Sequence, residues 1–210
     1  MGAAERTGPG GSMAEYDVTR EWARIVGWLG IMAPLSAAAL RAPVAEVPHA
    51  DLPHGSDAAL PGELSRLLAL NDGCEPGTPG AAFLPHGNRL MRRAEIGPVA
   101  ETLNALLDED VIGSWWHPAW VPFATMSEGS MDCLFIDVRP GLGFGQVGSF
   151  FDETGGELGW WPSLGAFLAD TARALQEVRP VAAWRPPASA AVGVRPVLPQ
   201  VEDDILVWRR

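Results

Sequence analysis

Apolar residues recur at helical spacing along much of the chain. Trp22, Ile25 and Leu29 fall three or four positions apart, so they share one face of a helix that we expect over residues 19–32. Ser163 precedes another such pattern, and its hydroxyl can accept a hydrogen bond from the first turn of a helix. The remaining patterns and their stop signals predict helices over 35–40, 60–70, 98–107 and 164–177.

Strand-like runs follow in the second half of the chain. We expect three successive antiparallel strands over 121–125, 133–138 and 146–151, because the segments between them are rich in turn-forming Gly, Ser and Pro. Two shorter runs, 82–84 and 89–91, are predicted to form a small hairpin around a Pro-His-Gly-Asn turn.

The length of the chain predicts one folded domain, and a short leader is expected before it. A chain of 210 residues can bury one substantial core, and it is short for two. Residues 1–17 read as a disordered leader, in which Met13 is an alternative start to Met1. The folded domain is expected to span residues 18–178.

The last part, residues 179–210, reads as a Pro-rich tail. Five prolines fall between Pro180 and Pro199, and neither helical nor alternating spacing accompanies them, which indicates an extended linker. Residues 205–210 form a short apolar end. This end could fold back as an edge strand or dock on a partner.

The net charge of the chain favours some classes of binding partner over others. The net charge is -11, and all 15 basic residues are arginines. An acidic chain is a poor match for nucleic acid or an anionic membrane, because both require a basic surface, whereas a basic protein would be attracted to it. Acidity that serves only solubility is the alternative. No apolar run approaches the roughly 18 residues of a membrane helix, and no secretory signal is visible at the N-terminus, so we expect a cytoplasmic protein.

Candidate chemistry is sparse. Cys74 and Cys133 have neither zinc nor disulfide spacing and are expected to be buried free thiols. Residues 143–148 spell G-x-G-x-x-G, but a strand-like run follows them, so a hairpin turn is favoured over a dinucleotide site. The four histidines lie in separate loops, and we expect no metal and no cofactor. Asp132 and Asp137 lie five positions apart along a strand, so they should face opposite ways and form no carboxylate pair.

Nine tryptophans form the most distinctive part of the composition. Core packing accounts for most of them, but the doublets Trp115-Trp116 and Trp160-Trp161 cannot both point inward on extended backbone, so one member of each is expected to be exposed. Exposed tryptophans favour binding, either to a protein or, as the alternative, to the sugar rings of a glycan.

Five motifs occur in an order that resembles the Smi1/Knr4 family of the SUKH superfamily, over roughly residues 22–177. They are the opening helix at 21–25, Leu60-Pro61-Gly62 leading to Asn71-Asp72-Gly73, Trp120-Val121-Pro122-Phe123-Ala124, Gly145-Gln146-Val147, and Ser163-Leu164-Gly165-Ala166-Phe167-Leu168. The chain departs from the family pattern in the segment before Leu60 and at Gly129-Ser130-Met131-Asp132, which stands where the family has Gly-x-Gly-Asp.

The resemblance implies an α+β fold, with a mixed, largely antiparallel sheet flanked by helices. It also implies a non-catalytic, protein-binding role. Bacterial relatives are often immunity proteins that neutralise a toxin, commonly a nuclease, and fungal relatives regulate cell-wall assembly. An acidic surface suits a basic nuclease. The candidate partner contacts are Trp116, Glu128, Asp132, Asp137 and Trp161, and an enzyme is the least favoured class because no nucleophile has a placed base.

Overall fold

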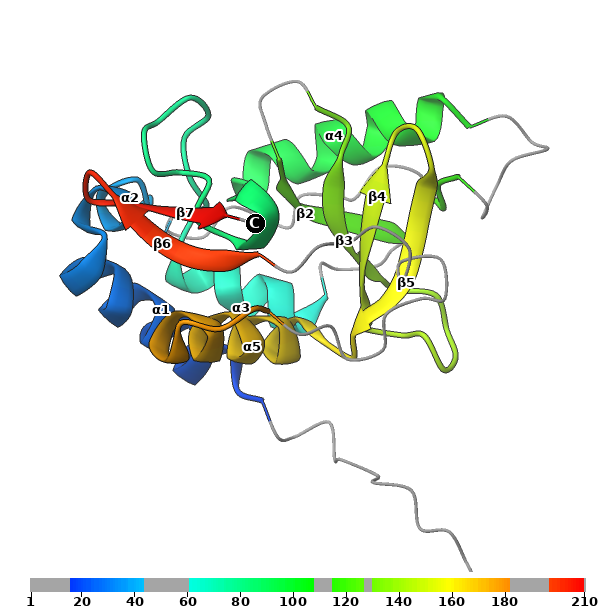
Figure 1. Cartoon of the computed structure of the whole chain (residues 1–210). Coiled ribbons are helices and arrows are strands. Elements are labelled where there is room, and N and C mark those ends of the chain that lie inside the picture. Colours follow the sequence, from blue (N-terminus) through cyan, green and yellow to red (C-terminus); the bar gives the residue numbers. More distant parts are fainter. Residues whose placement is uncertain (1–15, 44–60, 108–114, 127–129, 182–196, 210) are drawn as a thin grey trace, which may run out of the picture.

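The computed structural model describes residues 16–43, 61–107, 115–126, 130–181 and 197–209 (Figure 1). The predicted α+β class is confirmed. Within these residues the helices are α1 (Val18–Met32), α2 (Pro34–Ala38), α3 (Gly62–Leu70), α4 (Arg93–Ala105) and α5 (Leu164–Glu177), with a short 3-10 turn η1 (Pro85–Gly87). The strands are β1 (Arg89–Leu90), β2 (Trp120–Thr125), β3 (Cys133–Asp137), β4 (Val147–Phe151), β5 (Gly155–Trp161), β6 (Leu198–Glu202) and β7 (Ile205–Arg209).

The central sheet has the order β1-β2-β3-β4-β5, and each neighbouring pair is antiparallel. The three predicted strands therefore form its middle, as expected. The mixed character implied by the resemblance is absent from the ladders that the structure describes. Strand β5 was not predicted, because its sequence, Gly-Gly-Glu-Leu-Gly-Trp-Trp, lacks the alternation that marks a strand.

The hairpin predicted over 82–91 is reduced to a single antiparallel bridge between Leu84 and Asn88. Residues 85–87 form a 3-10 turn, and Arg89 and Leu90 pair with Thr125 and Ala124 of β2 instead of with the preceding run. Helix α4 also begins five residues earlier than predicted. Its start at Arg93 carries a capping box in which the Glu95 side chain accepts a hydrogen bond from the Arg92 N–H, so the helix is established before Pro98 is reached.

Both faces of the sheet are covered, and nearly every residue of β2, β3 and β4 is buried. On one face Trp116 packs edge-on against Phe135 of β3 and Phe150 of β4. On the other, Phe167 of α5 meets Phe123 of β2. Pro122 is tolerated inside β2 because the pairing register shifts between Pro122 and Ala124, where a bulge releases a ladder position.

Helices α1, α3 and α5 form one group, whereas α4 packs against β2 (Figure 1). The predicted cap of α5 is confirmed, since the Ser163 hydroxyl accepts a hydrogen bond from the Ala166 N–H. None of the helices in the described part of the chain is both long and apolar enough to cross a membrane.

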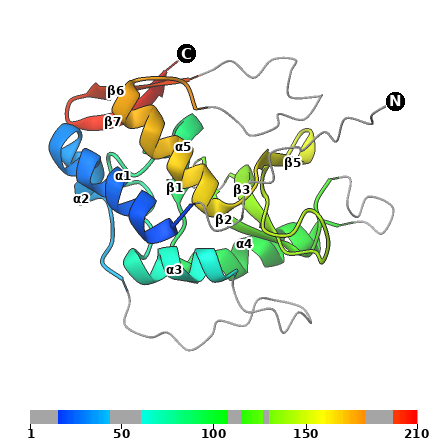
Figure 2. The same ribbon diagram turned by 90° about the horizontal axis from the view of Figure 1, so that it is seen from below.

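The C-terminal end folds back onto the domain. Strands β6 and β7 form a hairpin that lies beside α2 and α5 (Figure 2). The Leu206 N–H donates to the Ser36 hydroxyl at 2.9 Å, and the Trp208 indole donates to the Phe83 carbonyl at 2.8 Å. The domain therefore continues to Arg209, past the predicted end at 178. The predicted leader up to residue 15 and most of the linker, 182–196, lie outside the described residues.

Replacing Leu206 by Ala should lower the free energy of unfolding by about 2 to 3 kcal/mol, because Leu206 is 1% exposed and its loss leaves a cavity under the hairpin. Urea denaturation of the full chain measures this change. Val201 faces Leu206 across the hairpin and is exposed, so Val201→Ala serves as the control and should change stability by less than about 0.5 kcal/mol. Equal losses in the two variants would show that the hairpin does not pack as described.

Candidate functional site

An open hollow of about 690 Å³ lies where the start of β3 meets the turn between β4 and β5. We call it the acidic hollow. Three of its lining residues, Asp132, Asp152 and Glu153, are acidic, and none of its described lining residues is basic. The remaining lining residues are Ser130, Met131, Phe151 and Thr154. The hollow therefore combines uncompensated negative charge with two apolar side chains.

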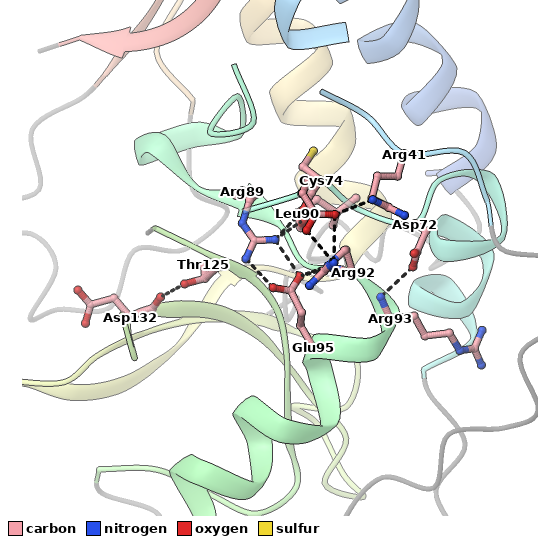
Figure 3. A network of polar contacts seen from close by, with 11 residues as sticks. Arg41, Asp72, Cys74, Arg89, Leu90, Arg92, Arg93, Glu95, Thr125 and Asp132 are labelled. Atoms are coloured by element: carbon pink, nitrogen blue, oxygen red, sulfur yellow. Dashed lines mark hydrogen bonds and ion pairs between the residues drawn. The ribbon is translucent and has the colours of Figure 1, made fainter. Parts of the chain in front are cut away.

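The two loops that form the acidic hollow are tied to each other. The Asp132 carboxylate accepts a hydrogen bond from the backbone N–H of Asp152 at 2.9 Å, and the Trp115 indole donates to the Asp152 carbonyl at 2.8 Å. Thr125 in turn donates its hydroxyl to the Asp132 carbonyl at 3.2 Å (Figure 3). Because both backbone groups of Asp152 are hydrogen-bonded, the backbone that carries its exposed carboxylate is anchored at the acidic hollow.

A second hollow of about 360 Å³ lies beside the first, along α4, and we call it the α4 hollow. The two share Ser130 and Met131. Apolar side chains from α4 and from the segment before it line much of the second hollow, namely Pro76, Met91, Val99 and Leu103.

The charged floor of the α4 hollow is an ion pair between Arg89 and Glu95 (Figure 3). Arg89 is 6% exposed, and its guanidinium donates to both Glu95 carboxylate oxygens, at 2.8 and 3.0 Å, and to the Cys74 carbonyl. Burial by itself would raise the pKa of Glu95. The hydrogen bonds from Arg89 and from the Arg92 N–H, with the positive charge of both arginines, outweigh burial and hold this pKa below its usual value.

The Asn-Asp-Gly motif supports this network from behind. Asp72 accepts a hydrogen bond from the Arg93 N–H at 2.9 Å and thereby caps α4, while the Asn71 side chain donates to the Arg41 carbonyl. A carboxylate at the helix N-terminus also complements the helix dipole. The motif therefore has a structural role, which is to join the end of α3 to the start of α4.

Of the predicted partner contacts that the structure describes, only Asp132 lies at the acidic hollow. Glu128 lies outside the described residues. Trp116, Asp137 and Trp161 are 0%, 1% and 5% exposed, so the prediction that they lie on a contact surface is wrong.

Each buried side chain has internal partners that explain its position. Trp116 donates its indole N–H to Asn104 of α4, and Trp161 donates to Asp170 of α5. The Asp137 carboxylate accepts hydrogen bonds from the Arg139 backbone N–H at 2.9 Å and from its guanidinium at 2.7 Å, and so closes the loop between β3 and β4.

The tryptophan doublets behave differently from each other. In the first doublet Trp115 is the partly exposed member, although its ring packs edge-on against Phe150. In the second doublet both Trp160 and Trp161 are buried, and Trp161 packs edge-on against Phe167 of α5. The expectation of one exposed member per doublet therefore fails for the second doublet, and in the first the partly exposed member is Trp115 and not the predicted Trp116.

The remaining candidate chemistry is structural. Cys74 and Cys133 are buried free thiols, as predicted, and burial raises the pKa of Cys74 to about 12 and that of Cys133 further. The G-x-G-x-x-G segment enters β4 and opens no helix. Among the described residues no group of three or more His, Cys, Asp or Glu side chains could hold a metal ion.

Sequence reasoning missed Asp152 and Glu153. Both are exposed in the turn between β4 and β5, and β5 itself was not predicted. The signal that could have found them is the Asp-Glu-Thr-Gly-Gly run directly after an apolar strand, which is typical of a turn.

Comparison with models of protein families finds a match to this chain. A model described as the SMI1 / KNR4 family (SUKH-1) matches residues 56–170, which contain α3, α4 and the whole central sheet. A search of curated proteins found no significant match. The match covers more than half of the chain and includes both hollows. The chain therefore belongs to the SMI1/KNR4 family.

Proposed function

We propose that this chain is a non-catalytic protein-binding domain that acts as an immunity-type protein in the cytoplasm. In this role it docks a basic partner, such as a nuclease toxin, on its acidic hollow. The observation that carries the proposal is the concave cluster of Asp132, Asp152 and Glu153, in which Asp132 joins the two loops, on a chain with a net charge of -11.

Electrostatics supports this assignment. A nuclease presents a basic groove to phosphates, and an acidic inhibitor approaches such a groove faster than a neutral one does. The carboxylates of the acidic hollow belong to two loops joined by hydrogen bonds, so little ordering is needed when a partner docks. Blocking the groove of a toxin would require contact and no chemical step.

The glycan alternative has less support. Sugar binding requires exposed aromatic faces, but Trp116, Trp120, Trp160 and Trp161 are all buried. Trp115 is partly exposed, and its indole N–H already donates to Asp152.

The double variant Asp152→Asn/Glu153→Gln should associate with a basic nuclease toxin domain about tenfold more slowly at low salt than the native chain does, because it lacks two steering charges. At high salt the difference should shrink, since screening removes long-range attraction. Surface plasmon resonance with the full chain at several salt concentrations measures both effects.

The matched control is Asp203→Asn/Asp204→Asn. It removes the same charge from the turn between β6 and β7, where both residues have positive φ values that Asn tolerates. This control should bind at nearly the native rate. Equal slowing by the two variants, or association that does not depend on salt, would contradict docking at the acidic hollow.

A further inference from the structure

We propose that the acidic hollow and the α4 hollow together hold one extended segment of a protein partner. This segment has a Lys or Arg side chain for the acidic hollow and, two or four residues away, a bulky apolar side chain for the α4 hollow. The inference rests on the proposed function, and it specifies the chemistry of the partner that the site accepts.

The two hollows are adjacent parts of one surface. Ser130 and Met131 line both, so the Met131 side chain stands between them. Met131 is itself partly buried against the core, which fixes this divider in place. A segment that fills both hollows has to pass over Met131, and it meets apolar surface at that point.

The hollows differ in the charge that they leave unpaired. In the α4 hollow the Glu95 carboxylate already accepts hydrogen bonds from the Arg89 guanidinium and from the Arg92 N–H. Arg92 also contacts Glu75 at 3.0 Å. These charges cancel, and a partner charge placed there would be desolvated with little compensation. The apolar walls therefore favour an uncharged apolar side chain.

In the acidic hollow the balance is reversed. Asp152 and Glu153 are exposed, and no basic residue is among the described side chains that line it. A partner cation gains attraction from Asp132, Asp152 and Glu153, while its alkyl stem can lie against Phe151, which is 42% exposed.

The geometry of extended backbone fits this division. Successive residues advance by about 3.3 Å, and alternate side chains point the same way, so side chains two residues apart are about 7 Å apart and side chains four apart about 13 Å. This range suits two neighbouring hollows on either side of one methionine. A helical segment would need the same two side chains at three- or four-residue spacing.

Selection from a random heptapeptide library displayed on phage, with the full chain as target, tests the inference. The enriched peptides should pair Lys or Arg with Leu, Phe, Met or Trp two or four positions away. Recovery of peptides without that pairing, or no enrichment at all, would overturn the proposal.

Variants then locate the binding of one enriched peptide, made synthetically and measured by fluorescence anisotropy. Thr102→Arg places a cation in the α4 hollow and should weaken binding at least tenfold, whereas Ala105→Arg, an exposed position on α4 outside the hollow, should leave it within twofold. Asp152→Asn/Glu153→Gln should weaken it similarly and abolish the preference for a basic residue. Equal binding by the two arginine variants would overturn the assignment of the α4 hollow.

Failure of this inference is distinguishable from failure of the proposed function. Toxin binding that depends on Asp152 and Glu153, without enrichment of the paired peptides, would refute the extended segment and leave the immunity role standing. Suppose instead that peptides with the expected pair of side chains bind, whereas a toxin does not. This result would refute the immunity role and leave the extended-segment site of the two hollows standing.

Discussion

Replacing Glu95 by Ala is expected to lower the free energy of unfolding by about 3 to 5 kcal/mol, one of the largest losses that we expect from a single substitution in this chain. The reason is the charge left behind. Arg89 is 6% exposed, and without Glu95 its hydrogen-bond partners among the described residues are the carbonyl oxygens of Cys74 and Leu90. Removing one member of a buried ion pair leaves an uncompensated charge in a medium that solvates it poorly.

The control for Glu95→Ala replaces both charges. Arg89→Met/Glu95→Met removes the pair without leaving a lone ion, so it should cost clearly less than Glu95→Ala alone. Guanidinium denaturation followed by tryptophan fluorescence measures both variants. A double variant that is less stable than Glu95→Ala would show that the pair contributes through packing or hydrogen bonds and not through mutual neutralisation.

Acid should act on the same pair. The pKa of Glu95 is lowered in the folded chain, so its contribution is complete above the unfolded pKa of about 4.3 and is lost as the pH falls through the lower, folded value. Glu95→Gln does not titrate. Its stability should therefore fall less than that of the native chain between about pH 5 and pH 2.

Gly73→Ala is expected to destabilise the chain by about 3 kcal/mol or more. Gly73 has a φ of +66°, which an alanine adopts only with strain, and an added Cβ would lie well within 3.0 Å of the Met91 carbonyl oxygen. The atom that it meets belongs to the backbone, in the segment between β1 and α4. Relief of the clash would move this segment and with it the Asp72 cap on Arg93.

Gly27→Ala is the matched control, and it should have the opposite sign. Gly27 lies within α1, where an added Cβ meets nothing within 4 Å, so the substitution should stabilise the chain by about 0.5 to 1 kcal/mol. Thermal unfolding of both variants by circular dichroism provides the comparison. A Gly73→Ala variant as stable as the native chain would show that this turn differs from its description.

Much of the fold could be predicted because its elements have strong local patterns. Helices α1, α3 and α5 have apolar residues at helical spacing, and β2, β3 and β4 are bounded by turn residues. The pairing of strand β1 could not be predicted in the same way, since its two residues carry no period and their partner, β2, lies more than 30 positions along the chain. Pairing over such a distance is decided by the whole core and not by local sequence.

The candidate site was predicted only in part for a related reason. Periodicity indicates which face of a strand is buried, but it does not show that a second layer covers the outer face as well. Trp116 and Asp137 were therefore expected on the surface, although an aromatic cluster encloses Trp116 and Arg139 pairs with Asp137. Asp132 lies at the acidic hollow because it precedes β3, outside the doubly covered region, and its role as a partner contact stays a prediction.

The contact between the C-terminal hairpin and α2 limits how far the chain can be truncated. The family match ends at residue 170 and begins at residue 56, yet Leu35 and Ser36 bind Asp204 and Leu206 across that whole interval. The segments that flank the matched region therefore bind each other. A minimal fragment for crystallisation or display should therefore retain residues 16–209. Trimming to the matched region, residues 56–170, would remove both flanking segments and the hydrogen bonds between them.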